Sequence, residues 1–137
     1  MAVKIVMIID DDADDREIFC EALQEVDGSV QCISCSSGAE GLEILNRPDQ
    51  ALPDFIFLDL NMPRMNGKQC LQELKQTDKL KDLPVFIYST SKIADDVKTT
   101  QQHGAVYFIT KPCSIKELRH TIRTVLSNNW SKLDSSN

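Results

Sequence analysis

Five short apolar runs alternate with segments of helical spacing along this chain. The runs are Ile5–Ile9, Val30–Cys35, Phe55–Leu58, Val85–Tyr88 and Ala105–Ile109. Four of them are nearly continuous rather than alternating, which is typical of parallel strands covered on both faces. The segments between them carry apolar residues three or four positions apart, as amphipathic helices do. We therefore predict an α/β fold, a five-stranded parallel sheet with helices on both faces.

The predicted helices differ in the strength of their apolar stripes. The clearest stripe lies in the last helix and consists of Ile115, Leu118, Ile122, Val125 and Leu126. The fourth predicted helix, at about residues 92–103, offers only Ile93, Ala94 and Val97, so we expect it to be the most loosely held. Three capping patterns mark helix starts; they pair Ser37 with Glu40, Asn66 with Gln69 and Ser114 with Glu117.

Length and charge narrow the class of protein. The 137 residues suit a single domain, and 15 basic against 21 acidic side chains give a net charge of −6. This acidic balance argues against a nucleic-acid surface, which needs clustered Lys and Arg. No apolar stretch is long enough for a membrane span, and the apolar start is too short for a signal peptide. We expect a cytoplasmic protein with no membrane insertion and no direct nucleic-acid partner.

The end of the chain differs in composition from the rest. Residues 127–137 are polar apart from Trp130 and Leu133, and such termini commonly fray. We expect one domain over residues 1–129 and a polar tail over residues 130–137. No linker to a second apolar pattern follows, so no output domain is expected.

The five cysteines are an odd number and are scattered along the chain. Without a secretion signal they are interpreted as reduced thiols. Cys32 and Cys35 form a C-x-x-C pattern, but they lie in a predicted strand, where residues three apart point to opposite faces. Neither a disulfide between these two nor a shared metal site is therefore expected.

Polar residues follow the apolar runs where the predicted strands end. Asp10–Asp12 follow the first run, Asp59 the third, Ser89 ends the fourth, and Lys111 follows the fifth. In an open α/β sheet these ends share one edge, where ligands bind. Carboxylates converging there would repel one another without a cation, and carboxylate, carbonyl and water oxygens suit Mg²⁺. A nearby lysine ammonium and serine hydroxyl are groups that a phosphoryl group would need.

Some of these polar residues have a purely structural explanation, and others do not. Asp12, Asp14 and Asp15 are explained by the dipole of the first helix, whose start favours negative charge. Asp59 is different, because it ends a strongly apolar and central strand, where a merely solvated acid is out of place. Ser89 and Lys111 would be unremarkable alone, and their joint placement with Asp59 favours a functional role.

Four motifs together resemble the receiver domain of bacterial two-component response regulators. They are Asp10-Asp11, Asp59-Leu60-Asn61-Met62-Pro63 with Gly67, Ser89-Thr90 and Lys111-Pro112. Their order and spacing match over about residues 3–128. The resemblance implies the flavodoxin-like receiver fold with strand order 2-1-3-4-5. Because no output domain is expected, the chain resembles the stand-alone, single-domain receivers of the chemotaxis type.

The resemblance implies a phosphoacceptor and a metal site. Asp59 would be the nucleophile that accepts a phosphoryl group from a histidine kinase or a histidine phosphotransfer protein. Asp11 would bind Mg²⁺ directly, together with Asp59 and the main-chain carbonyl of Asn61, and Asp10 would act largely through bound water. Mn²⁺ would serve as a substitute.

The resemblance also implies a switch. Lys111 would pair with Asp59 or with the phosphoryl oxygens, and the Lys111–Pro112 bond would be cis. Ser89 would move to hydrogen-bond the phosphoryl group, and Phe108 would change rotamer with it. Many relatives carry Thr and Tyr at these two positions, so a partner contact through a tyrosine hydroxyl is absent at Phe108.

The implied function is signal transduction in a phosphorelay. The protein would not be an enzyme in its own right, although it would assist its own phosphorylation and dephosphorylation. A downstream protein would bind the face made by the fourth helix, the fifth strand and the fifth helix. That fourth helix is the one with few apolar anchors.

Three alternatives compete with this function. A phosphatase of the haloacid-dehalogenase type needs a second Asp two residues after the nucleophile, where this chain has Asn61. A flavodoxin-like FMN protein needs a phosphate loop after the first strand, where the acids from Asp10 onward would repel phosphate. The third is a degenerate receiver that acts as a phosphorylation-independent binding module, although every acceptor-site residue is present.

Overall fold

A computed structural model describes residues 3–90, 94–128 and 130. The strands are β1 (Ile5–Ile9), β2 (Gln31–Cys35), β3 (Phe55–Leu58), β4 (Val85–Ser89) and β5 (Tyr107–Thr110). The helices are α1 (Ala13–Val26), α2 (Gly38–Leu45), α3 (Gly67–Gln76), α4 (Ala94–Gln102) and α5 (Ile115–Leu126). All strand pairs are parallel and the sheet order is β2-β1-β3-β4-β5. The predicted fold class and strand order are confirmed.

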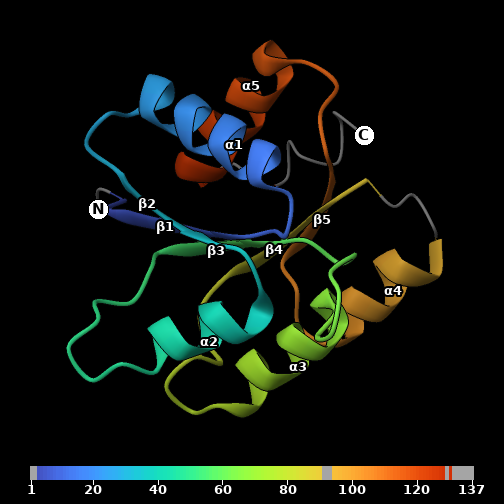
Figure 1. The fold of residues 1–137 in the computed structure, drawn as a ribbon. Helices are drawn as coiled ribbons and strands as arrows, with labels where there is room; N and C mark the ends of the chain where they lie inside the picture. Colours follow the sequence, from blue (N-terminus) through green and yellow to red (C-terminus); the bar gives the residue numbers. More distant parts are fainter. Residues whose placement is uncertain (1–2, 91–93, 129, 131–137) are drawn as a thin grey trace.

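The sheet separates two apolar layers. Figure 1 shows α1 and α5 on one face of the sheet and α2, α3 and α4 on the other. Alternate residues of β1 serve the two layers: Val6 and Ile8 join the cluster on the α1–α5 side, and Met7 and Ile9 join the other. This double coverage explains why the strand sequences are continuously apolar.

Helix starts follow the predicted capping residues. The side chains of Ser37, Asn66 and Ser114 each accept a hydrogen bond from the backbone N–H three residues later. At Asn66 the reciprocal bond from its own N–H to Gln69 completes a capping box. The Glu40 side chain instead accepts from the N–H of Ser36. In the part of the chain that the structure describes, no helix has the length and apolar character needed to cross a membrane.

Trp130 contradicts the expectation of a frayed tail from Ser127 onward. Its ring lies 5.3 Å from Phe86 and 5.9 Å from Phe55 between centroids, and its Nε1 donates to the carbonyl of Val125. The reason is that a large aromatic ring gains enough from burial to hold the chain just beyond a helix. The rest of the expected tail, residues 131–137 with Leu133, lies outside the described residues.

The α4 helix has little apolar burial. Among residues 95–102, whose side chains are described, only Thr100 is fully buried, and its hydroxyl donates to the carbonyls of Asp96 and Val97. Val97 is half-buried and packs against the core cluster. Ile93, the expected anchor at the start of the helix, lies outside the described residues.

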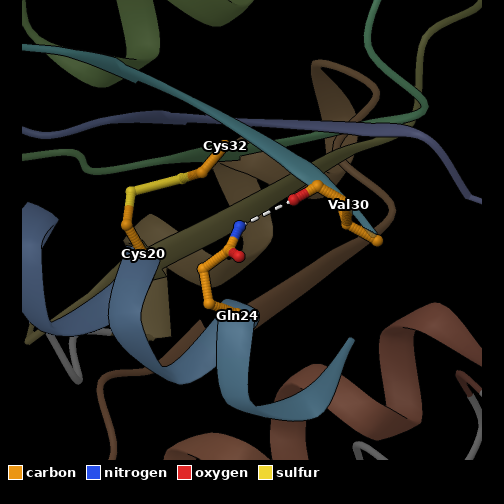
Figure 2. The surroundings of a disulfide bond; sticks show 4 residues. All are labelled: Cys20, Gln24, Val30 and Cys32. Carbon is orange, nitrogen blue, oxygen red and sulfur yellow. Dashed lines mark hydrogen bonds between the residues drawn. A yellow bond between two sulfur atoms is a disulfide. The ribbon is translucent and has the colours of Figure 1, made fainter. Parts of the chain in front are cut away.

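The interpretation of all five cysteines as reduced thiols is wrong for two of them. Cys20 of α1 and Cys32 of β2 form a disulfide with a Cα–Cα distance of 5.9 Å (Figure 2). The C-x-x-C pattern involves only Cys32 and Cys35, whereas α1 crosses back over β2 and places a helix residue, Cys20, beside the strand. Cys35 and Cys70 are free and buried, and Cys113 is free and exposed. The expectation that Cys32 and Cys35 do not pair is confirmed.

Candidate functional site

Three carboxylates meet at the carboxyl edge of the sheet. In the register of β1 and β3, Ile9 lies opposite Leu58, so the residues that follow, Asp10 and Asp59, leave the sheet side by side. Each of Asp10, Asp11 and Asp59 has an oxygen within 4.8 Å of one from the other two. Asp10 and Asp59 are buried, and Asp11 is exposed. The predicted convergence of these three acids is therefore observed.

The loop after Asp59 is held close by Gly67, the first residue of α3. The N–H of Gly67 donates to the carbonyl of Leu60 at 2.9 Å. A Cβ at Gly67 would overlap the carbonyl oxygen of Asp59, so only glycine permits this approach. The N–H of Asn61 faces Asp59 Oδ1 at 3.5 Å. The start of α3 thus fixes the backbone on which the Asp59 carboxyl is mounted.

The Asp59 carboxyl has an unusual environment for an acid. Burial raises its pKa to about 6, with a further rise from the charge of Asp10. The positive charge of Lys111 and hydrogen bonds from the Asn61 N–H and the Ser89 side chain act in the opposite direction on the pKa. The negative charge is therefore costly at this position, and a bound cation would relieve the cost.

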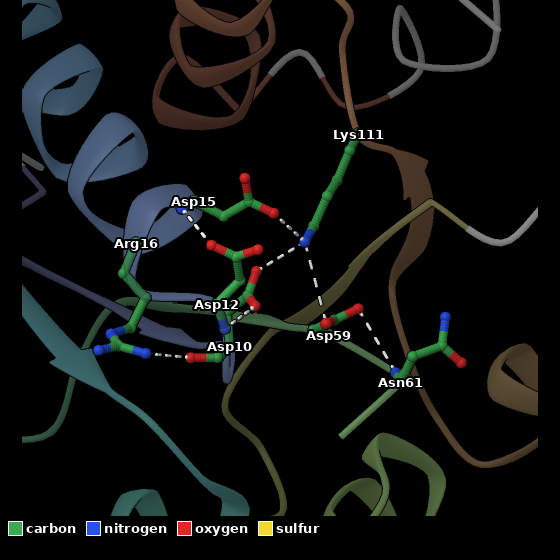
Figure 3. A network of polar contacts seen from close by, with 7 residues as sticks. All are labelled: Asp10, Asp12, Asp15, Arg16, Asp59, Asn61 and Lys111. Atoms are coloured by element: carbon green, nitrogen blue, oxygen red, sulfur yellow. Dashed lines mark hydrogen bonds and ion pairs between the residues drawn. The ribbon is translucent and has the colours of Figure 1, made fainter. Parts of the chain in front are cut away.

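Lys111 reaches the acids from the end of β5. Its Nζ lies 2.8 Å from Asp10 Oδ2, 2.7 Å from Asp15 Oδ2 and 3.9 Å from Asp59 Oδ2 (Figure 3). Burial alone would lower the pKa of Lys111, but the hydrogen bonds to Asp10 and Asp15 and the charge of Asp59 raise it overall. The ammonium group also lies 5.6 Å from the centre of the Tyr88 ring. Lys111 is charged and is shared unequally among three carboxylates.

Asp15 and Arg16 are residues of the site that the sequence analysis missed. Asp15 stands in the first turn of α1 as expected, but it also binds Lys111. Arg16 donates to the carbonyl of Asp10 at 2.7 Å. Asp12 is the N-cap of α1 and accepts a hydrogen bond from the N–H of Asp15. Its place at the start of the helix therefore explains this acid, as expected. The sequence could have indicated both residues, because Asp15 and Arg16 lie within one helical turn of Asp12.

The expected cis bond between Lys111 and Pro112 is wrong, because no described peptide bond is cis. A trans bond is the ordinary state before proline, where the tertiary amide favours trans by about 0.5–1 kcal/mol. With this trans bond Lys111 reaches Asp10 and Asp15 more closely than Asp59.

Ser89 and Phe108, the two residues expected to form a switch, lie at the end of β4 and within β5, respectively. Ser89 ends β4, is fully buried, and accepts the N–H of Lys111 on its carbonyl. Phe108 lies opposite Ile87 in the sheet and is 8% exposed, within the core cluster that also contains Met62 and Ala105. Ser89 and Phe108 therefore lie on neighbouring strands, with the Phe108 side chain in the core.

The donor set fits a hard divalent cation. The converging atoms are carboxylate oxygens, two of the three acids are buried, and Lys111 supplies a single positive charge against four nearby carboxylates, those of Asp10, Asp11, Asp15 and Asp59. Mg²⁺ and Mn²⁺ both take oxygen ligands of this kind.

The fold resembles solved structures of response regulators over most of its length. The phosphorylated cyanobacterial phytochrome response regulator RcpA is 26% identical, with a TM-score of 0.82 over 99% of this chain and 97% of that one. The Mn²⁺-bound form of response regulator Rcp1 is 25% identical, with a TM-score of 0.75 over 89% of this chain and 91% of that one.

Sequence relatives point the same way. The chain is 27% identical to response regulator Rcp1 of Synechocystis over 90% of its length and 87% of that protein. It is 31% identical to the sensor histidine kinase CheAY of Helicobacter pylori over 87% of its length, but it spans only 14% of that kinase, and 50% of the Bacillus subtilis regulator DctR. The sequence profile of the response regulator receiver domain matches residues 6–123, so this chain belongs to the receiver-domain family of two-component signalling proteins.

Proposed function

We propose that this receiver domain accepts a phosphoryl group on Asp59 from a histidine kinase or a histidine phosphotransfer protein. The observation that supports this most is the position of the Asp59 carboxyl. It is mounted at the end of β3, beside two other carboxylates and 3.9 Å from the Lys111 ammonium. Phosphoryl transfer needs positioning and charge neutralisation more than covalent chemistry, and this arrangement supplies both.

The chain's own residues divide the task. Asp59 supplies the attacking oxygen, and its buried backbone, pressed against Gly67, holds that oxygen in place. Lys111 neutralises the transferred group by moving from Asp10 and Asp15 toward Asp59. The Ser89 side chain donates a hydrogen bond at the same edge. The protein assists its own phosphorylation and dephosphorylation in this way and is not otherwise an enzyme.

Asp10, Asp11, Asp59 and the backbone carbonyl of Asn61 would hold Mg²⁺, with Mn²⁺ as a substitute. The ion supplies positive charge for the phosphoryl oxygens. Asp11 is the exposed member of the set, whereas both carboxylate oxygens of Asp10 already accept hydrogen bonds, from the N–H of Asp12 and from Lys111, which suits direct binding by Asp11 and a water-mediated role for Asp10.

The proposed output is a change of the face made by α4, β5 and α5. When Ser89 is drawn to the phosphoryl group, the space beside β5 changes and the Phe108 ring turns. A separate downstream protein binds that face. With a kinase or phosphotransfer protein as donor and a separate downstream protein as target, the domain acts in the cytoplasm. It binds neither nucleic acid nor membrane lipid directly.

A competing function is that of a degenerate receiver, which binds a partner without phosphorylation. The completeness of the acceptor site, with Asp59, Lys111 and Ser89 at one edge, favours phosphorylation. The two functions differ in what happens when a small phosphodonor is added.

Incubation with radiolabelled acetyl phosphate tests the proposal. The wild type should incorporate label in Mg²⁺ and not in EDTA, with the acid and base lability of an acyl phosphate. Asp59→Asn should abolish labelling, whereas Asp49→Asn, an exposed acid of the α2–β3 connection, should label normally. Asp11→Asn should lose the response to Mg²⁺. Labelling that persists in Asp59→Asn, or a wild type that takes up no label in Mg²⁺, would overturn the proposal.

A further inference from the structure

The Cys20–Cys32 pair joins α1 to the edge strand β2 at a place that is also fixed by a hydrogen bond. Gln24 Nε2 donates to the carbonyl of Val30 at 2.8 Å, next to the disulfide (Figure 2). Residues 20 and 24 lie one turn apart on the same side of α1, and residues 30 and 32 share a face of the extended segment. The contact between Gln24 and Val30 therefore holds the two cysteine positions in register, whether or not their sulfur atoms are bonded.

Cys20 is half-buried and lines a groove that is open to solvent. An open groove of roughly 420 Å³ on the outer side of α1 is lined by Glu17, Cys20, Glu21, Gln24 and Glu25. Its three glutamates repel anionic reagents and attract neutral or cationic ones. Two other thiols are poorly placed to compete, because Cys35 and Cys70 are buried and burial raises the pKa of each to about 12.

Both cross-linked elements touch the phosphoacceptor site. On α1, Arg16 lies one turn before Cys20 and holds the carbonyl of Asp10, and Asp15 holds Lys111 at 2.7 Å. On β2, the carbonyl of Cys35 accepts the N–H of Asp10 at 3.0 Å. The disulfide thus ties together the two elements that position Asp10 and hold Lys111 nearer Asp10 and Asp15 than Asp59.

We propose that Cys20 and Cys32 form a reversible dithiol–disulfide pair that exchanges with neutral or cationic low-molecular-weight disulfides and slows phosphorylation when oxidised. In the disulfide form α1 is held where Asp15 retains Lys111. In the dithiol form the Gln24–Val30 hydrogen bond still holds the middle of α1 to the segment that enters β2, but the first turn of α1, which carries Asp15, can shift, and Lys111 is released toward Asp59. Asp15 is then a positioning residue that acts through Lys111. The effect on phosphorylation rests on the function proposed above.

The exchange balances without a further reagent. The Cys20 thiolate attacks a sulfur of the small disulfide, forming a mixed disulfide and releasing one small thiolate. The Cys32 thiolate then attacks the Cys20 sulfur and releases the second, and the two protein protons leave on the two small thiols. In a cytoplasmic protein such a disulfide is usually transient and redox-sensing.

The first measurement uses Cys113→Ser, which removes the exposed thiol, and cystamine as the cationic disulfide. Mass spectrometry should show loss of two hydrogens and a Cys20–Cys32 cross-linked peptide, reversed by dithiothreitol. Cystamine should react at least about threefold faster than oxidised glutathione, which is anionic. The melting temperature should rise by about 10 °C on oxidation, as expected for a loop of this length. Cys20→Ser in the Cys113→Ser background should show neither the cross-linked peptide nor the rise in melting temperature.

The second measurement is the rate of labelling by acetyl phosphate in Mg²⁺. The oxidised form should be labelled at least about threefold more slowly than the reduced form. In Asp15→Asn this ratio should fall to about one, because α1 then no longer holds Lys111 and its position cannot affect the lysine. Asp14→Asn, the neighbouring acid of the same helical turn, should keep the ratio of the wild type.

Three results would overturn the proposal. One is the absence of a Cys20–Cys32 cross-link with cystamine. Another is a cross-linked protein that is labelled as fast as the reduced one, and the third is an unchanged ratio in Asp15→Asn. If neither redox form takes up label, the proposed function fails and the rate effect with it, whereas the exchange site is still judged by the cross-link.

Discussion

Helices α4 and α5 flank the same strand, β5, but they are held by different forces. Helix α5 buries an apolar stripe against the sheet, made of Leu118, Ile122 and Val125, with Thr121 and Thr124 beside it. Over residues 95–102 of α4, Thr100 is the one fully buried side chain and Val97 is half-buried. Burial stabilises by about 25 cal/mol per Å² of apolar surface, so α5 is much more firmly attached than α4.

Polar pairs tie α4 to α3 instead. Lys68 Nζ lies 2.6 Å from Asp96 Oδ1 near the start of α4, and Gln72 contacts His103 at 3.2 Å just beyond its end. Partly exposed pairs of this kind contribute about 0.2–1 kcal/mol each and can exchange partners for water. The free-energy cost of shifting a helix depends on the apolar side chains that the helix buries. We therefore expect α4, rather than α5, to shift when the charge at Asp59 changes.

Truncating a buried side chain should destabilise the fold much more in α5 than in α4. Ile122→Ala in α5 removes a side chain that is 1% exposed and should lower the free energy of unfolding by about 3–4 kcal/mol. Val97→Ala in α4 should cost about 1 kcal/mol or less, because that site is half-buried. Urea denaturation measures both. Equal costs at the two positions would remove the basis of the comparison.

The charge of Asp59, at the end of β3, should make the stability of the fold depend on pH. The folded pKa of Asp59 is raised to about 6 from 3.8, so the folded state binds this proton more tightly than the unfolded state. The stability from Asp59 is fully present below pH 3.8 and is lost as pH rises through 6. Asp59→Asn should therefore be more stable than the wild type by about 2–3 kcal/mol at pH 7 in EDTA, with little difference at pH 3.5. A difference that does not change between these pH values would contradict the burial argument.

Hydrogen exchange with beryllofluoride, a phosphoryl mimic, tests the comparison directly. In Mg²⁺ the mimic should change protection in α4 and β5 by about tenfold, which corresponds to a coupling of about 1.4 kcal/mol. The buried positions of α5 should change by less than about twofold. Asp59→Asn serves as the control and should show no change. Protection changes confined to the acidic edge would leave α4 passive.

The smallest expected effect comes from the polar pair itself. Lys68→Gln removes the ion pair with Asp96 and should lower global stability by only about 0.5 kcal/mol. Exchange in α4 should nevertheless become about twofold faster, because that pair is one of its few attachments. Arg119→Gln removes the matching ion pair between α5 and Glu25 and should leave exchange in both helices unchanged. If the two variants behave alike, α4 is not held by its polar pairs.

Much of the site could be predicted because strand ends share one edge. Asp10, Asp59, Ser89 and Lys111 each follow or end an apolar run, and a parallel sheet must bring such positions together. The role of Asp15 could not be predicted in this way. Its partner is 96 residues away, and a flexible lysine selects among several acids by distances that no local pattern encodes.

The alternation of apolar runs and amphipathic segments by itself determined the α/β class, the helix caps and the edge on which the acids gather. These features depend on residues within about four positions of one another or on the two-residue period of a strand. Such short-range patterns can be seen directly in the sequence. Only the tertiary structure decided that Cys20 pairs with Cys32, that Trp130 packs on the sheet, and that Lys111 lies nearer Asp15 than Asp59. The reason is that the position of a helix over the sheet follows from packing of the whole core, and a shift of a few ångströms changes which long-range partners meet.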